Sequence, residues 1–106
     1  MKILILGAGK MGTFFTDLLC LHHEVALYDV DPKRLRFVFN TYRFTQYEEI
    51  QEFEPELVLN CVTLKYTIEA FNSVLPYLPE NCMLSDIASV KTGLKEFYES
   101  TGKRFV

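Results

Sequence analysis

Apolar residues occur in short runs separated by polar turns, and the period of the pattern changes along the chain. The first run, residues 3–6, is aliphatic without alternation, which is typical of a strand covered on both faces of a parallel sheet. Further runs at residues 25–28, 57–62 and 82–88 have the same character, and residues 104–106 would open one more strand. The pattern therefore predicts a series of buried parallel strands.

Helical periodicity fills the intervals between these runs. In the first interval, five apolar residues at helical spacing are expected to face the core: Met11, Phe14, Phe15, Leu18 and Leu19. Asp31 can cap a helix that has Pro32 in its first turn and runs to about Asn40. The pattern is weakest over residues 41–55, where residues 47–53 are expected to form a short acidic helix.

Two more helices are expected towards the C-terminus. One places four apolar residues on a single face, namely Ile68, Phe71, Leu75 and Leu78, and the other runs from Thr92 to Ser100 and ends near Gly102. Strands and helices that alternate in this way build a parallel sheet with right-handed crossovers and helices on both faces. We therefore expect an α/β fold, a Rossmann-like doubly wound parallel sheet, in a single three-layer domain over residues 1–106.

A glycine-rich loop joins the first strand to the first helix. Residues 7–12 read G-A-G-K-M-G, and the spacing G-x-G-x-x-G is weak evidence by itself. Its context strengthens it, because the loop follows a buried strand, opens a helix, and is followed by Asp29 at the end of the next strand. Gly7 would allow the tight turn, Gly9 would let a pyrophosphate approach the backbone, and Gly12 would let the helix lie close to the sheet. The candidate cofactor-binding residues are Gly7, Ala8, Gly9, Lys10, Met11, Gly12, Asp29, Val62 and Thr63.

The residues after the second strand bear on the choice of cofactor. Asp29 would accept hydrogen bonds from the adenosine ribose, and its charge would repel a 2′-phosphate. Lys33, Arg34 and Arg36 follow closely and would favour that phosphate. NAD is therefore expected, with NADP the less favoured choice. The alternative to both is a glycine turn in an α/β protein that binds no nucleotide.

A second group of polar residues lies at residues 85–91, which read S-D-I-A-S-V-K and should reach the sheet edge that faces a nicotinamide. There Ser89, the candidate catalytic residue, could bond a substrate hydroxyl or the cofactor amide, and Lys91 could pair with a substrate carboxylate. Equally, Ser89 could cap the next helix and Lys91 could be a solvent-exposed charge.

Composition narrows the range of partners. The chain has 11 Lys and Arg against 14 Asp and Glu, a formal net charge of −3, so nucleic acid and membrane partners are not expected. No apolar stretch approaches the roughly 18 residues needed to span a bilayer. Cys20, Cys61 and Cys82 match no zinc spacing, so we interpret them as inert core thiols in a reducing cytoplasm, and we expect no metal site.

The order of these motifs resembles the prephenate and arogenate dehydrogenase family, the hydride-transfer enzymes of tyrosine biosynthesis. The matching segments are G-A-G-K-M-G, then Y-D, then L-V-L-N-C-V-T, then D-I-A-S-V-K, then K-R-F-V. The fourth segment is the most specific, because many dehydrogenases share the first three. The resemblance implies that Ser89 lies beside the nicotinamide and helps to position the substrate hydroxyl and a catalytic histidine. Thr63 stands where relatives often carry proline.

The resemblance also implies a longer protein, in which this chain is a C-terminally truncated nucleotide-binding domain. The complete protein would oxidise and decarboxylate prephenate or arogenate with NAD. Its catalytic histidine would belong to a His-Pro motif after Val106, and a helical domain would follow and form a homodimer. His22 and His23 lie at the far end of the first helix and are interpreted as loop residues. The 106 residues alone are expected to bind NAD weakly and not to turn over prephenate.

Two other functions remain open. One is a non-catalytic NAD(H)-sensing module of the type that regulates potassium transport, but residues 41–56 lack the acidic-glycine turn expected there, and D-I-A-S-V-K would have no role. The other is a different NAD(P)-dependent oxidoreductase, acting on a hydroxy acid or an imine.

Overall fold

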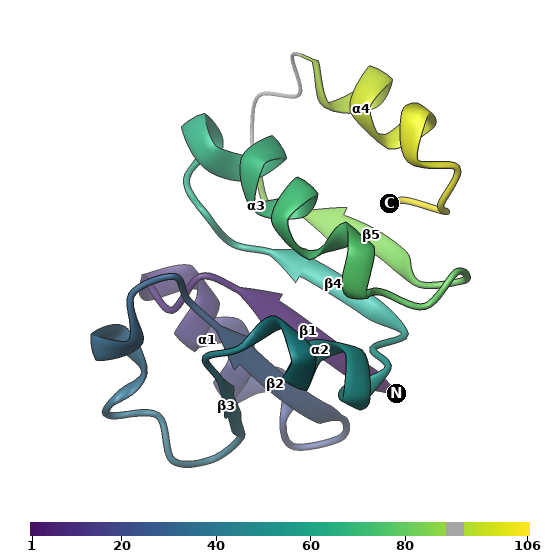
Figure 1. Ribbon diagram of the computed structural model, residues 1–106. Helices are drawn as coiled ribbons and strands as arrows, with labels where there is room; N and C mark the ends of the chain where they lie inside the picture. Colours follow the sequence, from purple (N-terminus) through teal and green to yellow (C-terminus); the bar gives the residue numbers. More distant parts are fainter. Residues whose placement is uncertain (89–92) are drawn as a thin grey trace.

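The computed structural model describes residues 1–88 and 93–106. Within these residues all strands pair in parallel in one sheet of order β3-β2-β1-β4-β5 (Figure 1). The strands are β1 (Lys2–Leu6), β2 (Glu24–Tyr28), β3 (Tyr42–Phe44), β4 (Leu57–Asn60) and β5 (Met83–Asp86). The sequence winds outwards from β1 in both directions, which confirms the expected α/β doubly wound fold.

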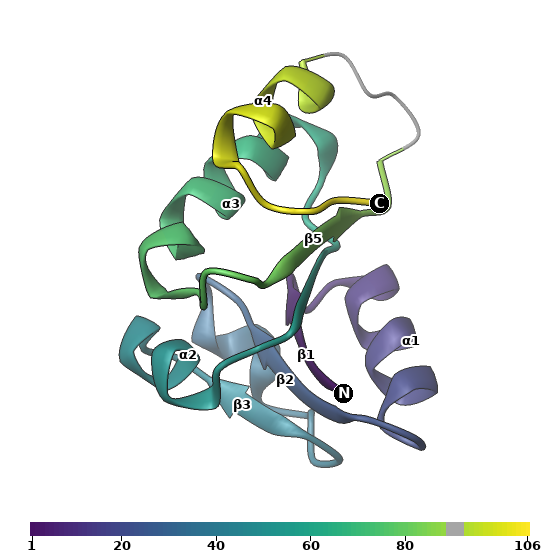
Figure 2. The ribbon, with the colours of Figure 1, turned by 90° about the vertical axis from the view of Figure 1, so that its right-hand side faces the viewer.

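Helices cover both faces of this sheet. They are α1 (Lys10–Leu19), α2 (Tyr47–Phe53), α3 (Thr67–Val74) and α4 (Leu94–Thr101). Figure 2 shows α1 on one side of the sheet and α2, α3 and α4 on the other. This segregation follows from the strand order, because right-handed crossovers in opposite directions place their helices on opposite faces.

Strand β1 shows why its sequence is continuously apolar. Ile3 and Ile5 belong to the core cluster on the α1 side, whereas Leu4 and Leu6 belong to the cluster beneath α3 and α4. All four side chains are at most 2% exposed. Successive side chains of a strand point to opposite faces, so a central strand between two helical layers needs apolar residues at every position.

The expected core face of α1 is partly wrong. Phe15 and Leu19 pack against the core, but Phe14 and Leu18 are more than half exposed and Met11 is 45% exposed. The helix instead turns Gly12 and Thr16 fully inwards, because the close approach of α1 to the glycine loop leaves no room for larger side chains there. Helical spacing is the same for both stripes, so the sequence pattern did not separate them.

The helix expected from Asp31 to about Asn40 is also wrong. A single 3-10 turn, Pro32–Leu35, follows Asp31, whose side chain caps the turn by accepting a hydrogen bond from the Lys33 N–H at 3.1 Å. Of the residues that follow, Val38 is buried but Phe37 and Phe39 are at least 75% exposed. Leu35 and Val38 both belong to the core cluster on the α1 side, so the chain buries these two side chains without continuing the helix.

The expected helix with Ile68, Phe71, Leu75 and Leu78 on one face is shorter than predicted: α3 ends at Val74, and Leu75 and Leu78 pack against the core from the 3-10 turn Leu75–Tyr77 and the residue after it.

The remaining elements lie close to their expected positions. The acidic helix α2 begins at Tyr47 and ends at Phe53, although the short strand β3 before it was not expected. Phe105 forms a parallel bridge to Leu84, which confirms that the last residues begin a further pairing beside β5. In the described residues, no helix is long and apolar enough to cross a membrane.

Candidate functional site

A cavity of about 760 Å³ opens at the carboxyl ends of β1, β2 and β4. Its walls are the glycine loop, the turn after β2, the loop after β4 and the first turns of α3. Pockets that hold small molecules and cofactors have volumes of roughly 300–1,000 Å³. It also lies where the strand order reverses between β1 and β4, the place where open α/β sheets bind ligands.

The glycine loop has the backbone shape that its sequence predicts. Gly7 has φ +96°, a conformation that side-chain-bearing residues rarely adopt. A Cβ built on Gly12 would lie 1.7 Å from the Gly7 carbonyl oxygen, so α1 can approach the loop only with glycine there. At Gly9 the nearest atom to such a Cβ is Arg34 Nη1 at 3.8 Å, which leaves open space over the backbone on the cavity side.

The N-terminus of α1 faces this space. The first hydrogen bond of the helix runs from the Thr13 N–H to the Gly9 carbonyl at 3.0 Å. The N–H groups of residues 9–12 therefore have no partner within the helix and are available to an anion, which the helix dipole also favours. Lys10 and Met11 are exposed at the same end. The loop, the helix end and the cavity together fit the pyrophosphate of a dinucleotide.

Asp29 ties the loop to the turn after β2. Its Oδ2 accepts a hydrogen bond from the Ala8 N–H at 2.8 Å, and its Oδ1 accepts one from the Asp31 N–H at 2.8 Å. Each carboxylate oxygen has a second lone pair, so both oxygens can still accept a hydrogen bond from a ligand hydroxyl in the cavity. Asp29 thus has a structural role that the sequence did not suggest, in addition to the predicted binding role.

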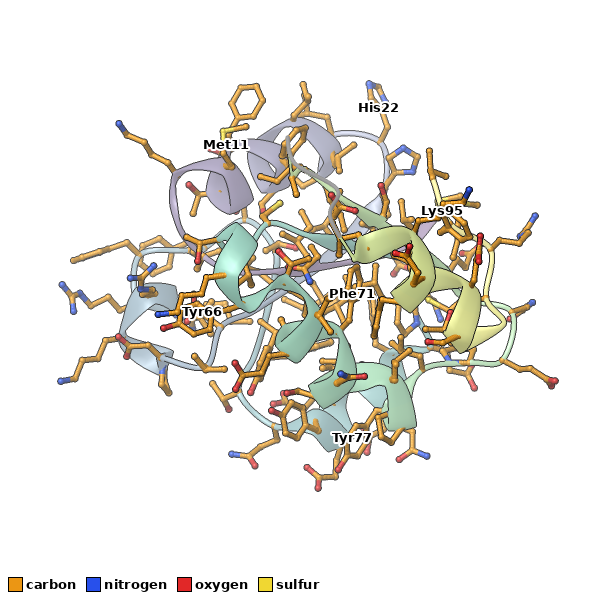
Figure 3. The ribbon with its side chains drawn as sticks, turned by 90° about the horizontal axis from the view of Figure 1, so that it is seen from above. Met11, His22, Tyr66, Phe71, Tyr77 and Lys95 are labelled. Atoms are coloured by element: carbon orange, nitrogen blue, oxygen red, sulfur yellow. The ribbon has the colours of Figure 1, made fainter. Side chains whose placement is uncertain are left out.

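The cavity is also lined by residues that were not among the candidates for direct contact, and Arg34, Tyr66 and Val30 are three of them. Arg34 reaches the cavity from the 3-10 turn after β2, and Tyr66, 48% exposed, lines it from the residue before α3. Val30, beside them, is 82% exposed. The tyrosine ring and the planar guanidinium of the arginine can each stack on an aromatic ring of a ligand at the mouth of the cavity. Figure 3 shows Tyr66 and Met11 on the same side of the molecule.

Val62 and Thr63 lie where the sequence placed them, on the loop after β4 that lines the cavity opposite the glycine loop. Val62 Cγ2 lies 3.2 Å from the position of a Cβ on Gly7, so the two loops are in contact. Cys61 lies beneath them, and burial raises the pKa of its thiol to about 12. Its thiol is therefore protonated at neutral pH and inert as a nucleophile, as expected for Cys61 and for buried Cys82, whose pKa burial raises to about 11.

Tyr28 lines the cavity at the end of β2. Burial and a hydrogen bond with Tyr47 raise the pKa of its phenol. Tyr28 therefore stays neutral over the whole physiological range and adds no negative charge to an anion site. Its ring lies 5.3 Å from that of Tyr47, which in turn stacks on Tyr77 at 5.1 Å, so an aromatic row supports this wall.

The second group of candidate residues is only partly described. Ser89 and Lys91 lie outside the described residues. Just before them, Asp86 ends β5, accepts the Ala88 N–H at 2.8 Å and accepts the Tyr98 hydroxyl. These bonds anchor the start of the segment to α4.

The two histidines lie away from the cavity. His22 and His23 follow the C-terminal end of α1, whereas the cavity lies at its N-terminal end, ten residues or about 15 Å along the helix. His22 and Met11 accordingly lie at opposite ends of α1 in Figure 3. Among the described residues, no group of three or more His, Cys, Asp or Glu side chains could hold a metal ion.

Comparison with known proteins shows similarity at the level of structure. No model of a known protein family and no curated protein matches the sequence. Prephenate dehydrogenase from A. aeolicus, solved in complex with hydroxyphenyl propionate and NAD+, is 25% identical with a TM-score of 0.86, over 99% of this chain and 40% of that one. Arogenate dehydrogenase from Synechocystis is 20% identical with a TM-score of 0.80, over 95% of this chain and 37% of that one.

Other reductases share the fold. Ketopantoate reductase from Ralstonia eutropha JMP134 is 19% identical with a TM-score of 0.80, over 99% of this chain and 40% of that one. Similarity to structures less than 25% identical in sequence shows a shared fold and does not identify the substrate. The chain is an α/β doubly wound domain whose structure resembles prephenate and arogenate dehydrogenases over 37–40% of their length.

Proposed function

We propose that the chain is the NAD-binding domain of a dehydrogenase that acts on prephenate or arogenate. The observation that carries this proposal is that the open N-terminus of α1, the bare backbone at Gly9 and the Asp29 carboxylate meet in one cavity. The structural similarity to an NAD-bound prephenate dehydrogenase at 25% identity supports it. When bound, the nicotinamide supplies the hydride acceptor.

The residues of the chain bind and orient the cofactor. The N–H groups of residues 9–12 hold the pyrophosphate, and Gly9 permits its close approach. Asp29 accepts the adenosine ribose hydroxyls through its remaining lone pairs. Its charge would repel a 2′-phosphate on that ribose, which favours NAD, whereas Arg34 in the same cavity would favour the phosphate of NADP. We propose that the carboxylate prevails, because it is fixed by two backbone hydrogen bonds at the end of a strand.

The test is the ratio of the affinities for NAD and NADP, measured by calorimetric titration of the wild-type chain, Asp29→Ala and Arg34→Ala. The wild type should prefer NAD. Asp29→Ala should shift the ratio towards NADP by about tenfold, because a hydrogen bond to a charged group contributes ~1.5–3 kcal/mol. Arg34→Ala should shift it in the opposite direction. Asp29→Ala also removes the hydrogen bond from the Ala8 N–H, which should weaken the binding of both cofactors alike. The ratio of the two affinities therefore reports only the effect at the ribose.

Equal affinity of the wild-type chain for both cofactors, with a ratio that neither substitution changes, would refute the assignment of Asp29 to the ribose. Binding of neither cofactor by a folded wild-type chain would refute the proposed function itself.

For the complete protein we propose oxidative decarboxylation of prephenate or arogenate in a homodimer in the cytoplasm. Ser89 would orient the substrate hydroxyl beside the nicotinamide. Both histidines of this chain lie at the edge of the sheet opposite the cavity, so neither is placed to act as the general base, and we propose that a histidine outside these residues does so. We therefore expect the 106 residues alone to show no NADH formation with prephenate.

A further inference from the structure

The last residue of strand β4 is Asn60, whose side-chain amide is buried. In the sequence it lies within the apolar run at residues 57–62. The Asn60 side chain is 1% exposed. Its Nδ2 donates to the Thr67 carbonyl oxygen at 2.9 Å, and its Oδ1 accepts the Val62 N–H at 3.0 Å. Asn60 therefore joins the beginning of the loop after β4 to the first residue of α3.

A buried hydroxyl completes the arrangement from the other side. Thr67 is 1% exposed, and the single proton of its hydroxyl is shared between the Thr63 carbonyl oxygen at 3.2 Å and the Val62 carbonyl oxygen at 3.4 Å. The Tyr66 N–H also donates to the Thr63 carbonyl, at 2.9 Å. These bonds close residues 60–67 into one compact loop.

The arrangement controls which groups of the loop face the cavity. Residues 61–63 line the cavity next to the glycine loop, which they contact at Gly7. The Val62 N–H is bonded to Asn60, and the carbonyl oxygens of Val62 and Thr63 share the one hydroxyl proton of Thr67. A carbonyl oxygen turned towards a bound pyrophosphate would repel it, because both carry negative charge.

We propose that Asn60 and Thr67 are positioning residues of the dinucleotide site, which hold the carbonyl oxygens of Val62 and Thr63 away from the bound anion. This inference rests on the proposed function. Neither side chain lines the cavity, so both act through the loop. Loss of the Thr67 hydroxyl leaves the Val62 carbonyl without that donor and frees the loop to turn.

The test compares the affinity for NAD of three variants with that of the wild-type chain, well below the melting temperature of each. Thr67→Val keeps the shape of the side chain and removes the hydroxyl, and it should weaken NAD binding by about tenfold, the effect of ~1.4 kcal/mol. Thr67→Ser keeps the hydroxyl and removes a methyl group, and it should bind within about twofold of the wild type. Asn60→Asp removes the donor to the Thr67 carbonyl and should weaken binding as Thr67→Val does.

A matched control is Thr16→Val. Thr16 is likewise 1% exposed, and its hydroxyl donates to the Gly12 carbonyl at 2.8 Å, one helical turn back and inside α1. Thr16→Val should lower the melting temperature about as much as Thr67→Val but leave the affinity for NAD within about twofold of the wild type.

These measurements distinguish failure of the positioning role of Asn60 and Thr67 from failure of NAD binding itself. If the wild type binds NAD and Thr67→Ser is as weak as Thr67→Val, packing rather than the hydroxyl matters, and the inference is overturned. It is overturned too if Thr16→Val and Thr67→Val weaken binding equally, or if Thr67→Val binds like the wild type. If the wild-type chain binds no NAD, the proposed function fails first.

Discussion

Alanine at position 12 is expected to lower the free energy of unfolding by at least about 3 kcal/mol, the upper end of the range for overpacked sites. The new Cβ would lie 1.7 Å from the Gly7 carbonyl oxygen and 2.9 Å from its carbonyl carbon, both of them backbone atoms that no rotamer change can move. Alanine is the better helix former by ~1 kcal/mol, but the clash is larger than this gain. α1 must therefore move away from the sheet. Chemical denaturation measures the loss.

A substitution elsewhere in the same helix provides the comparison. Phe14 is 55% exposed and its main ring contact is edge-to-face with Phe15, so Phe14→Ala should lower the free energy of unfolding by only about 1 kcal/mol. A Gly12→Ala variant as stable as Phe14→Ala would show that α1 does not pack as closely as described.

Unlike Gly12→Ala, the Gly9→Ala variant is expected to lose much of its affinity for NAD and little of its stability. The backbone of Gly9 has φ −81°, which alanine adopts readily, and its Cβ would meet only the end of the Arg34 side chain at 3.8 Å. That Cβ would stand over the N–H groups that we propose to bind the pyrophosphate. Loss of one hydrogen bond to a charged group costs ~1.5–3 kcal/mol, so affinity should fall at least about tenfold.

The control for this variant is Lys10→Ala, which removes an exposed charge at the same helix end and keeps every backbone N–H. Exposed charges contribute ~0–1 kcal/mol, so its affinity for NAD should fall by less than about fivefold. Calorimetric titration and thermal melting of both variants make the comparison. Tight binding of NAD by Gly9→Ala would mean that the phosphates do not lie against this loop.

Much of the fold could be predicted because burial of both faces of the sheet requires apolar residues at consecutive positions of its central strands. The run at residues 3–6 is apolar at every position because both faces of β1 are buried. The outer stripe of α1 could not be predicted, since Phe14 and Leu18 share the helical spacing of Phe15 and Leu19, and periodicity carries no direction. The early end of the helical turn after Asp31 could not be predicted, because it depends on how Leu35 and Val38 pack in the core.

The candidate site was predictable where function depends on backbone conformation. Gly7 and Gly12 are glycines for reasons that the structure makes explicit, a positive φ and a close contact. The second hydrogen-bonding role of Asp29 depends on a partner 21 positions away and left no local signal. Asn60 did leave one, since an amide within an apolar run has to find hydrogen-bond partners when it is buried.

The central claim is that one dinucleotide binds in the cavity between the glycine loop and the loop after β4. Amide NMR spectra of the wild-type chain, recorded during titration with NAD, test it most directly. Saturable shifts are expected to concentrate on residues 9–12, Asp29 and residues 62–63. Unchanged spectra, or shifts confined to the opposite edge of the sheet around His23 and Thr41, would contradict it.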